Sequence, residues 1–381
     1  MKTLRAILAA ALVAALVASV VLAAGDVDDV DDVLEWTRLG SLQPTSGPQP
    51  YVSVIATPSS DPAILYAGTL LTTPNAHLIY RTEDGGATWQ PADAGLPRDL
   101  PLNTGVDALA VHPTDSNLLY VGLRAHGVWR SEDGGASWQS VSGGGIGDDD
   151  STLALTFDPG PPSTVYALTE AGFHVSTNGR AWQKRANGLP PASSVVYNAL
   201  IVDPTDPDTL YVATNPRGLF RSTNGGKKWV EANGDLPPGA HNVKGIAISP
   251  ITGELFMSMR GAGLLRSADN AQTWTPSHNG ITYTRTLYGT VSAPVLSPTD
   301  PMLAYAFNAD GIFRSEDGGA TWAPYERGMS VLTTVTTLAT HPTQSWAAYA
   351  GTAISGVWAI KGVEEPPQDD PVKLFVPLIR R

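Results

Sequence analysis

The segment WRSEDGGASWQ, residues 129–139, contains the residue types that catalysis or cation binding would use. Glu132 and Asp133 are adjacent carboxylates beside the hydroxyl of Ser131, and two glycines follow them. Paired carboxylates can act as general acid and base, and their oxygens are the ligands that calcium prefers. The same residue types also build tight turns, in which a short acceptor side chain bonds nearby amides and glycine adopts a positive φ.

The segment recurs in five further copies, and their variation favours the turn. The position of Asp133 is aspartate in four copies and asparagine in two. Asparagine keeps an acceptor oxygen but cannot ionise, so a turn tolerates it, whereas acid–base catalysis or hard-cation binding does not. No copy has the alternating acidic positions and distal glutamate of a calcium loop. We therefore predict six structural turns without a metal, at Asp84, Asp133, Asn178, Asn224, Asp269 and Asp317.

Each copy ends in a tryptophan, and the spacing of these tryptophans gives the size of the repeating unit. The interval is 44 to 49 residues, which matches one four-stranded blade of a β-propeller. In the unit that contains Trp138, alternation and turn residues predict strands near 106–110, 118–123, 127–131 and 137–141. The six tryptophans are Trp89, Trp138, Trp182, Trp229, Trp274 and Trp322.

A seventh unit lacks the WRSEDGGASWQ-like segment but is visible by comparison with the second. Residues 335–359 align without a gap on residues 106–130, with 12 of 25 positions identical, and supply three strands. The segment LEWTRLG at residues 34–40 offers the missing fourth strand, with Trp36 as its closing tryptophan. A ring closed in this way has no free sheet edge. We predict an all-β fold, a seven-bladed β-propeller of four-stranded antiparallel blades, with the last blade closed by the N-terminal strand.

The composition agrees with an exported globular domain. Hydrophobic residues make up 42% of the 381 residues, and the chain contains no cysteine, so neither disulfides nor thiol chemistry contribute. The formal net charge of −12 disfavours nucleic-acid partners. Residues 1–24 have the basic start, apolar run and small-residue exit of a signal peptide, although an uncleaved membrane anchor is the alternative. We expect a secreted or cell-surface, extracytoplasmic protein.

The remaining segments divide around the propeller, which we expect to span residues 34–361. Residues 25–33 form an acidic spacer, and residues 362–371 form a Pro-rich acidic linker. The tail at 372–381, VKLFVPLIRR, is apolar and basic. It could serve in sorting or surface attachment, or dock on the ring as an extra strand. Contact with a membrane is expected only through this tail or an uncleaved signal.

The six copies resemble the Asp-box, S-x-D-x-G-x-x-W, of the BNR-repeat superfamily, as in Ser131, Asp133, Gly135 and Trp138. This superfamily includes sialidases, β-glucan hydrolases, sortilin-type receptors and the seven-bladed photosystem II assembly and stability factors. The architecture is most similar to the last of these. The resemblance implies that ligands are met in the central channel or on the face opposite the Asp-boxes. The sialidase motif Phe/Tyr-Arg-Ile-Pro does not occur in the sequence.

We therefore looked for ligand contacts in the loops between the second and third strands and between blades. Arginines recur at similar places in three blades and could form a cationic patch for carboxylates or an acidic peptide. Ordinary solvated loop residues are the alternative. The candidate ligand-binding residues are His77, Arg124, His126, Arg217, Arg260 and Arg285, and further polar loop residues are Arg98, Asp148, Asp149, Asp150, His241 and Tyr283.

These observations lead to one leading function and two alternatives. We expect a monomeric, non-catalytic propeller without a cofactor that binds a protein or glycan partner through the face opposite the Asp-boxes. The first alternative is an extracellular glycoside hydrolase, sialidase-like or β-glucanase-like. Its weak candidate acids are Glu170 and Asp310, which lie almost opposite each other in blades 3 and 6. The second alternative is a surface scaffold.

Overall fold

The computed structural model describes residues 34–43, 48–73, 76–159, 164–236, 241–284, 290–329 and 333–362. The predicted signal peptide, acidic spacer, C-terminal tail and all of the linker after Gly362 lie outside the described residues, as does Arg285. One compact unit, Trp36–Ile360, contains the ring. Within the described segments, no helix has the length and apolar character of a membrane span.

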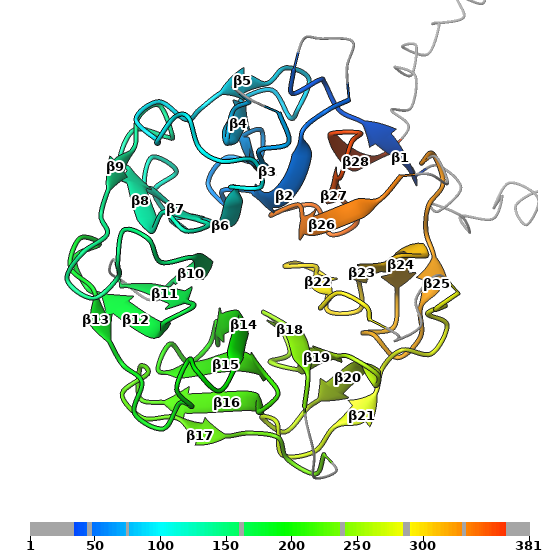
Figure 1. Ribbon diagram of the computed structural model, residues 1–381. Coiled ribbons are helices and arrows are strands. Elements are labelled where there is room, and N and C mark those ends of the chain that lie inside the picture. Colours follow the sequence, from blue (N-terminus) through cyan, green and yellow to red (C-terminus); the bar gives the residue numbers. More distant parts are fainter. Residues whose placement is uncertain are drawn as a thin grey trace, which may run out of the picture. The chain divides into compact units, whose positions relative to one another are not determined.

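Seven four-stranded antiparallel sheets surround a central axis, which confirms the predicted fold class (Figure 1). Blade 1 contains β2 (Tyr51–Ala56), β3 (Leu65–Leu70), β4 (Ile79–Thr82) and β5 (Gln90–Pro91). Blade 2 contains β6 (Val106–Val111), β7 (Leu119–Leu123), β8 (Val128–Ser131) and β9 (Gln139–Ser140). Blade 3 contains β10 (Thr152–Phe157), β11 (Val165–Thr169), β12 (Gly172–Ser176) and β13 (Gln183–Lys184).

The remaining blades repeat this order from the axis outward. Blade 4 contains β14 (Val196–Val202), β15 (Thr209–Asn215), β16 (Gly218–Thr223) and β17 (Val230–Glu231). Blade 5 contains β18 (Val243–Ile248), β19 (Leu255–Met259), β20 (Gly263–Ser267) and β21 (Thr275–Pro276). Blade 6 contains β22 (Val295–Leu296), β23 (Ala304–Asn308), β24 (Gly311–Ser315) and β25 (Ala323–Pro324). Blade 7 contains β26 (Val335–Thr340), β27 (Ala348–Thr352), β28 (Val357–Gly362) and β1 (Leu34–Arg38).

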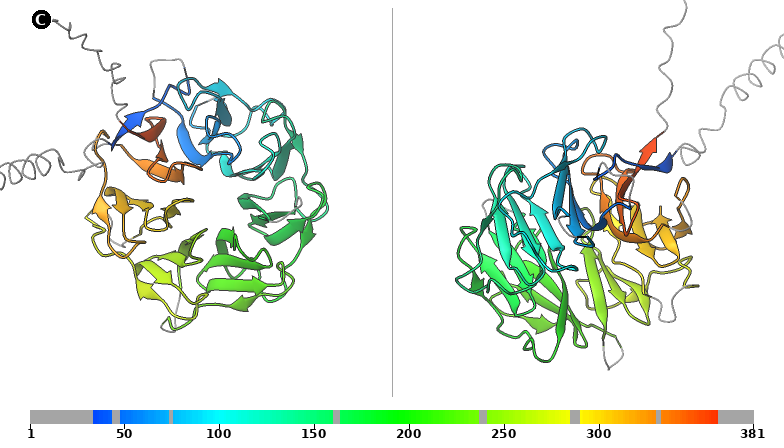
Figure 2. Two further views of the ribbon diagram at one scale, coloured as in Figure 1. Left: turned by 180° about the vertical axis from the view of Figure 1, so that it is seen from behind. Right: turned by 45° about the horizontal axis from the view of Figure 1, so that its top comes forward.

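Blade 7 is closed by the N-terminal strand, as predicted, because β1 pairs with β28 (Figure 2). Trp36 takes the place of a closing tryptophan. Its indole Nε1 donates to the carbonyl of Tyr325 in blade 6 at 2.9 Å. The indole of Trp138 donates in the same way to the carbonyl of Ala92 in blade 1 at 2.8 Å. Each of these tryptophans therefore joins its blade to the preceding one.

The fourth strands are shorter than predicted. The sequence suggested a strand over 137–141, whereas β9 contains only Gln139 and Ser140. The reason is that the backbone of Trp138 does not pair with β8. Its N–H donates instead to the carbonyl of Ala94 in blade 1 at 2.9 Å. Its side chain packs among the buried residues between blades 1 and 2. The closing tryptophan thus stabilises the contact between two blades and does not extend the outermost strand of its own blade.

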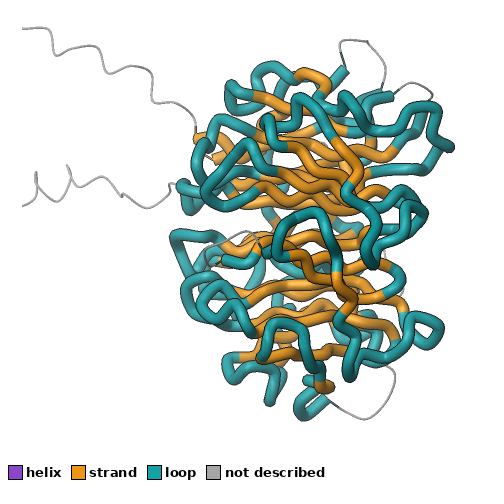
Figure 3. The backbone as a smooth tube through the Cα atoms, turned by 90° about the vertical axis from the view of Figure 1, so that its left-hand side faces the viewer, coloured by secondary structure: helices purple, strands orange, loops and turns teal. Residues whose placement is uncertain are grey.

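The two surfaces of the ring have different connections. Strand alternation places the first turn of each blade and the Asp-box turn on one surface, which we call the Asp-box face. The turn between the second and third strands and the segment leading to the next blade lie on the other, which we call the loop face. Figure 3 shows the loops gathered at the two ends of the strands.

A bulge recurs in the innermost strands of six blades, close to the loop face. In each case the pairing with the second strand skips one residue, for example Ser53 between Val52 and Val54. A β-bulge re-aims the side chain of the unpaired residue. The six skipped residues, which we call the bulge residues, are Ser53, Asp107, Leu153, Asn198, Lys244 and Thr336.

Three of the bulge residues connect neighbouring blades. Ser53 Oγ donates to the carbonyl of Val106 at 2.6 Å, and Asn198 Nδ2 donates to the carbonyl of Val243 at 2.5 Å. Thr336 Oγ1 donates to the carbonyl of Val52. Each acceptor immediately precedes the bulge residue of the next blade. Ser53, Asn198 and Thr336 therefore hold successive blades together around the axis.

Candidate functional site

The Asp-box carboxylates are engaged within their own turns. Asp133 Oδ1 accepts hydrogen bonds from Ser131 Oγ at 2.7 Å and from the backbone N–H of Ser137 at 2.8 Å. Its Oδ2 accepts from Ser137 Oγ at 2.6 Å. Although burial raises the pKa of Asp133, the bonds from Ser137 and Ser131 lower it below its usual value. Gly134 and Gly135 have φ values of 70° and 87°, which explains the glycine pair.

The two asparagine copies make the corresponding contacts with an amide oxygen. Asn178 Oδ1 accepts from the backbone N–H groups of Arg180 and Ala181 at 3.0 and 2.9 Å. Asn224 Oδ1 accepts from Ser222 Oγ and from the backbone N–H of Lys228 at 3.0 and 2.9 Å. A neutral acceptor therefore fits the turn. The described part of the chain also contains no group of three histidine or acidic side chains placed to hold a metal.

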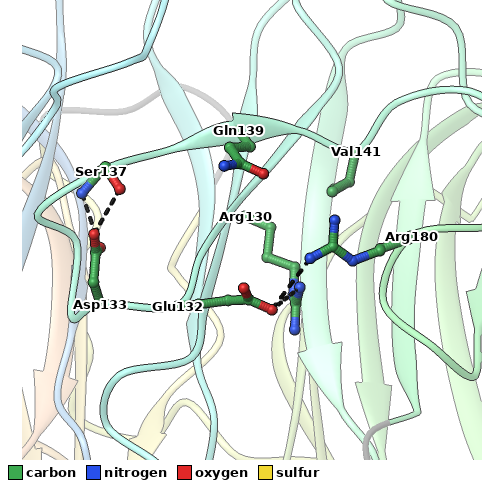
Figure 4. A pocket seen from close by; sticks show the side chains of 7 residues that line it. All are labelled: Arg130, Glu132, Asp133, Ser137, Gln139, Val141 and Arg180. Carbon is green, nitrogen blue, oxygen red and sulfur yellow. Dashed lines mark hydrogen bonds and ion pairs between the residues drawn. The ribbon is translucent and has the colours of Figure 1, made fainter.

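A small hollow of about 170 Å³ lies beside the second Asp-box (Figure 4). The adjacent carboxylates point to different partners there, Asp133 to Ser137 and Glu132 to arginines. Glu132 forms ion pairs with Arg130 and, at 3.3 Å, with Arg180. The side chain of Glu132 is 59% exposed, and its pair with Arg180 links blades 2 and 3 at the surface. The hollow is smaller than ordinary ligand pockets of about 300 to 1,000 Å³.

A larger cavity of about 600 Å³ opens on the loop face, between blades 2, 3 and 4. Two predicted candidates, Arg124 and Glu170, line it from the turns that follow β7 and β11. The bulge residues of all three blades also line it, and β14 begins at its wall. We call this space the loop-face cavity. The residues that give the cavity its charged, aliphatic and aromatic lining are Asp107, Arg124, Leu153, Glu170, Val196 and Tyr197.

Arg124 is held by a carboxylate of its own blade. Its Nε and Nη2 donate to Asp107 Oδ2 and Oδ1 at 3.1 and 2.7 Å, and Nη1 donates to the carbonyl of Asn103 at 3.2 Å. The hydrogen bond and charge of Asp107 raise the pKa of Arg124 above its usual value. The side chain of Asp107 is only 15% exposed, while that of Arg124 is 48% exposed. The guanidinium is thereby fixed at the cavity wall.

Glu170 and Asp310 are not brought together. Glu170 is exposed at the loop-face cavity, and its backbone N–H donates to the carbonyl of Ser151 at 3.1 Å. Asp310 lies in the turn between β23 and β24, where its Oδ2 accepts from the backbone N–H of Thr284 at 2.5 Å. Asp310 therefore orders the segment between blades 5 and 6, outside the cavity that Glu170 lines.

The arginines of blades 4 and 5 do not join Arg124 in a patch at this cavity. Arg217 lies 3.9 Å from Glu231, which belongs to the outermost strand β17. The backbone N–H of Arg260 donates to the carbonyl of Asn242 at 2.9 Å. Neither arginine lines the loop-face cavity. His126 is half-buried, and its carbonyl accepts a hydrogen bond from the indole of Trp129 at 2.9 Å.

His77 belongs to a separate cluster in blade 1. Its Nδ1 lies 3.0 Å from Asp93 Oδ1, and Arg98 Nη2 reaches the same oxygen at 3.0 Å. The backbone N–H of Leu78 donates to Asp93 Oδ2 at 3.0 Å. Asp93 is buried, and its bonds with His77 and Leu78 tie the segment after β5 to the start of β4, whereas Arg98 belongs to the same segment as Asp93. Arg98 and Asp93 also line a cavity of about 220 Å³, which is smaller than the loop-face cavity.

The loop-based analysis missed the bulge residues Asp107, Leu153 and Asn198, although a signal for them exists in the sequence. The innermost strands align as VSVIA, VDALA, TLALT, YNALI, VKGIA and VTTLA. Their second position is serine, aspartate, leucine, asparagine, lysine or threonine, while the fourth is always aliphatic. The second position of these strands thus changes in charge and polarity from blade to blade, while the rest of the strand is repeated. This variation is the signal that distinguishes one blade from another near the axis.

Comparison with known proteins relates the chain to two kinds of propeller. No protein-family model matches it. A probable oligoxyloglucan-reducing end-specific xyloglucanase of Neosartorya fischeri is 28% identical over 157 residues, which cover 36% of this chain and 18% of that protein. The GH74 xyloglucanase of Xanthomonas campestris has a similar structure, with a TM-score of 0.63 and 20% identity over 86% of this chain. That match covers 53% of the xyloglucanase, so the chain spans about half of its length.

The second kind of similar structure is the YCF48 propeller. YCF48 bound to D1 peptide has a TM-score of 0.60 and 15% identity, with coverage of 86% of this chain and 96% of YCF48. YCF48 from Cyanidioschyzon merolae has a TM-score of 0.56 and is covered completely. The expected resemblance to photosystem II assembly factors is thus confirmed for the architecture. At these identities the similarity establishes the fold alone.

Proposed function

We propose that this chain is an exported, non-catalytic propeller that binds a protein partner through the loop-face cavity. One observation carries the proposal. Residues of three successive blades bring an arginine, an exposed carboxylate and aliphatic side chains to one cavity of about 600 Å³. It lies on the face where the blades differ from one another, whereas the Asp-box face repeats the same turn chemistry.

The chemistry of the surface supports a protein partner. Val196, at the cavity wall, is 58% exposed, and Leu102, next to the Asn103 carbonyl that binds Arg124, is 52% exposed. Exposed aliphatic side chains beside an arginine are typical of protein interfaces. Tyr197 contributes an aromatic ring to the lining, but its hydroxyl is engaged with the carbonyl of Pro190 at 2.6 Å. The cavity thus resembles a peptide site more than an aromatic platform for sugars.

The similarity to YCF48 supports this proposal. YCF48, of which this chain covers 96%, has been solved with a peptide bound. A protein whose fold is similar over 86% of this chain thus binds a peptide. The predicted signal peptide and the similarity to the Xanthomonas campestris xyloglucanase support an extracytoplasmic location for this chain.

Two matched substitutions test the proposed face. Val196→Asp places a charge at the loop-face cavity, and Ile251→Asp places one at a 45% exposed site in the first turn of blade 5, on the Asp-box face. Partners would be captured with each variant from the envelope of the producing cell and their affinities measured by calorimetry. We expect Val196→Asp to lose the partner and Ile251→Asp to keep it. Equal capture by both variants would contradict the proposal.

A glycoside hydrolase is the second candidate, because Asp107 and Glu170 line the same cavity. Two carboxylates about 6.5 to 9.5 Å apart can act as acid and base in an inverting enzyme. Both oxygens of Asp107 are held by Arg124, which opposes its use as a proton donor. Release of reducing sugar from xyloglucan oligosaccharides, β-glucans and sialosides is the test. If the wild-type protein releases reducing sugar and Glu170→Gln does not, the chain is a hydrolase and the proposed non-catalytic function is wrong.

A further inference from the structure

The charges at the loop-face cavity specify the chemistry of its occupant. We propose that the cavity binds a peptide segment that carries a basic side chain next to aliphatic ones, with the basic group at Glu170. This inference rests on the function proposed above. It differs from the expectation of a cationic patch for acidic peptides, which the arginines alone suggested.

Arg124 does not offer a free positive charge to the occupant. Two of its nitrogens donate to Asp107 and the third donates to the carbonyl of Asn103. An incoming carboxylate would be limited to the two guanidinium N–H groups that these bonds leave, and it would place a second negative charge beside Asp107. Such an addition is unfavourable because Asp107 already balances the charge of Arg124 and is largely buried. The Arg124–Asp107 pair is thus a neutral part of the wall.

Glu170 contributes the charge at the cavity that the Arg124–Asp107 pair does not balance. It is exposed at the cavity, and no ion pair of its carboxylate is found among the described residues. Its backbone bond to Ser151 places it beside the segment that contains Asp148 and Asp149, both exposed. The adjacent Asp150 is engaged within its own turn, since its Oδ2 accepts from the N–H of Gly147 at 2.8 Å. The exposed carboxylates of Glu170, Asp148 and Asp149 outnumber the nearby ammonium of Lys184, which lies close to Gly172, so this side of the loop face attracts a cationic segment.

The aliphatic wall of the cavity fits a peptide in which a basic residue stands next to aliphatic residues. Leu153 is the bulge residue of blade 3, at the position where blades 1, 4 and 7 carry a polar side chain that joins two blades. With Val195 and Val196 it forms an aliphatic surface on the cavity. The stem of a lysine or arginine packs on such a surface while its charged end reaches a carboxylate. Aliphatic residues next to it in the partner would cover Val196.

Selection of peptides tests this directly. Random decapeptides displayed on phage would be selected on the wild-type protein and counter-selected on Val196→Asp, so that only peptides specific for the loop face remain. We expect enrichment of lysine or arginine beside leucine, isoleucine or valine. Enrichment of acidic or uncharged peptides would overturn this inference and leave the proposed function intact. Failure of every peptide to distinguish wild type from Val196→Asp would overturn both.

Fluorescence anisotropy with a labelled selected peptide then locates the charge. Glu170→Gln should weaken binding about threefold to fivefold at low salt, the size expected for one exposed ion pair. The difference should shrink at high salt. Glu132→Gln, a matched change on the Asp-box face, should leave binding unchanged. Glu170→Lys should reverse the preference toward acidic peptides. Equal affinity of wild type and Glu170→Gln, or an equal loss in Glu132→Gln, would refute the role of Glu170.

Discussion

The Asp-boxes and the bulge residues both recur from blade to blade, but they vary in different ways. An Asp-box exchanges aspartate for asparagine and keeps the hydrogen bonds to Oδ1, as Asp133 and Asn224 show. A bulge residue exchanges a polar side chain for a charged or an apolar one, and its contacts change with it. Asn198 bonds the next blade, whereas Asp107 holds Arg124. Repetition with conserved contacts indicates a structural role, and the bulge positions with altered contacts are where we propose that function is located.

The largest expected effect tests the structural side of this comparison. Trp138→Ala should lower the free energy of unfolding by about 3 to 5 kcal/mol, because it leaves a cavity between blades 1 and 2. It also removes the indole bond to the carbonyl of Ala92. Urea unfolding followed by tryptophan fluorescence measures the change. The exposed Leu102→Ala serves as control and should shift the midpoint little. A loss below about 1 kcal/mol would show that the blades do not depend on this contact.

The closing tryptophans also show what the sequence could predict. Their spacing predicted the size of the repeating unit, because a repeat reveals any position that it keeps. The alignment of residues 335–359 with residues 106–130 added the seventh blade, whose missing fourth strand indicated the role of Trp36. The pairing of Arg124 with Asp107 could not be predicted, although only 17 residues separate them. It depends on a bulge that turns Asp107 toward the loop face, and a one-residue change of register is not visible in the alternation of a short strand. Likewise, loop position alone made Asp310 a candidate acid, whereas its carboxylate accepts a hydrogen bond from the backbone N–H of Thr284.

A smaller effect is expected inside the Asp-box turn itself. Ser131 is buried, and its Oγ accepts the backbone N–H of Gly135 at 2.9 Å while donating to Asp133. Ser131→Ala should cost about 1 to 3 kcal/mol, because the Gly135 N–H is left without its acceptor. Thermal unfolding of Ser131→Ala and Ser140→Ala compares this site with an exposed serine of the same blade. If the two variants unfold alike, the hydroxyl does not hold the turn.

The bulge residues allow a structural and a functional role to be compared at equivalent positions of two blades. Ser53→Ala should cost about 1 kcal/mol, since it removes the bond from Ser53 Oγ to the carbonyl of Val106. Leu153→Ser alters the equivalent position in blade 3 and should weaken binding of a loop-face peptide more than Ser53→Ala does. Chemical unfolding and anisotropy on both variants separate the two effects. Loss of binding in Ser53→Ala without loss in Leu153→Ser would reverse our assignment of the functional blades.

The smallest effect concerns the charge of an Asp-box. Hydrogen bonds from the side chain and backbone of Thr273 and from Ser267 lower the pKa of Asp269 from 3.8 to about 2. Because the folded pKa is depressed, the ionised group contributes stability above pH 4, and this contribution is lost as the pH falls toward 2. Asp269→Asn cannot ionise, so its stability should depend less on pH between 4 and 2 while changing little at pH 7. Unfolding midpoints measured across this range for Asp269→Asn and wild type give the difference. Parallel pH profiles would mean that the aspartate copies, like the asparagine copies, act through geometry alone.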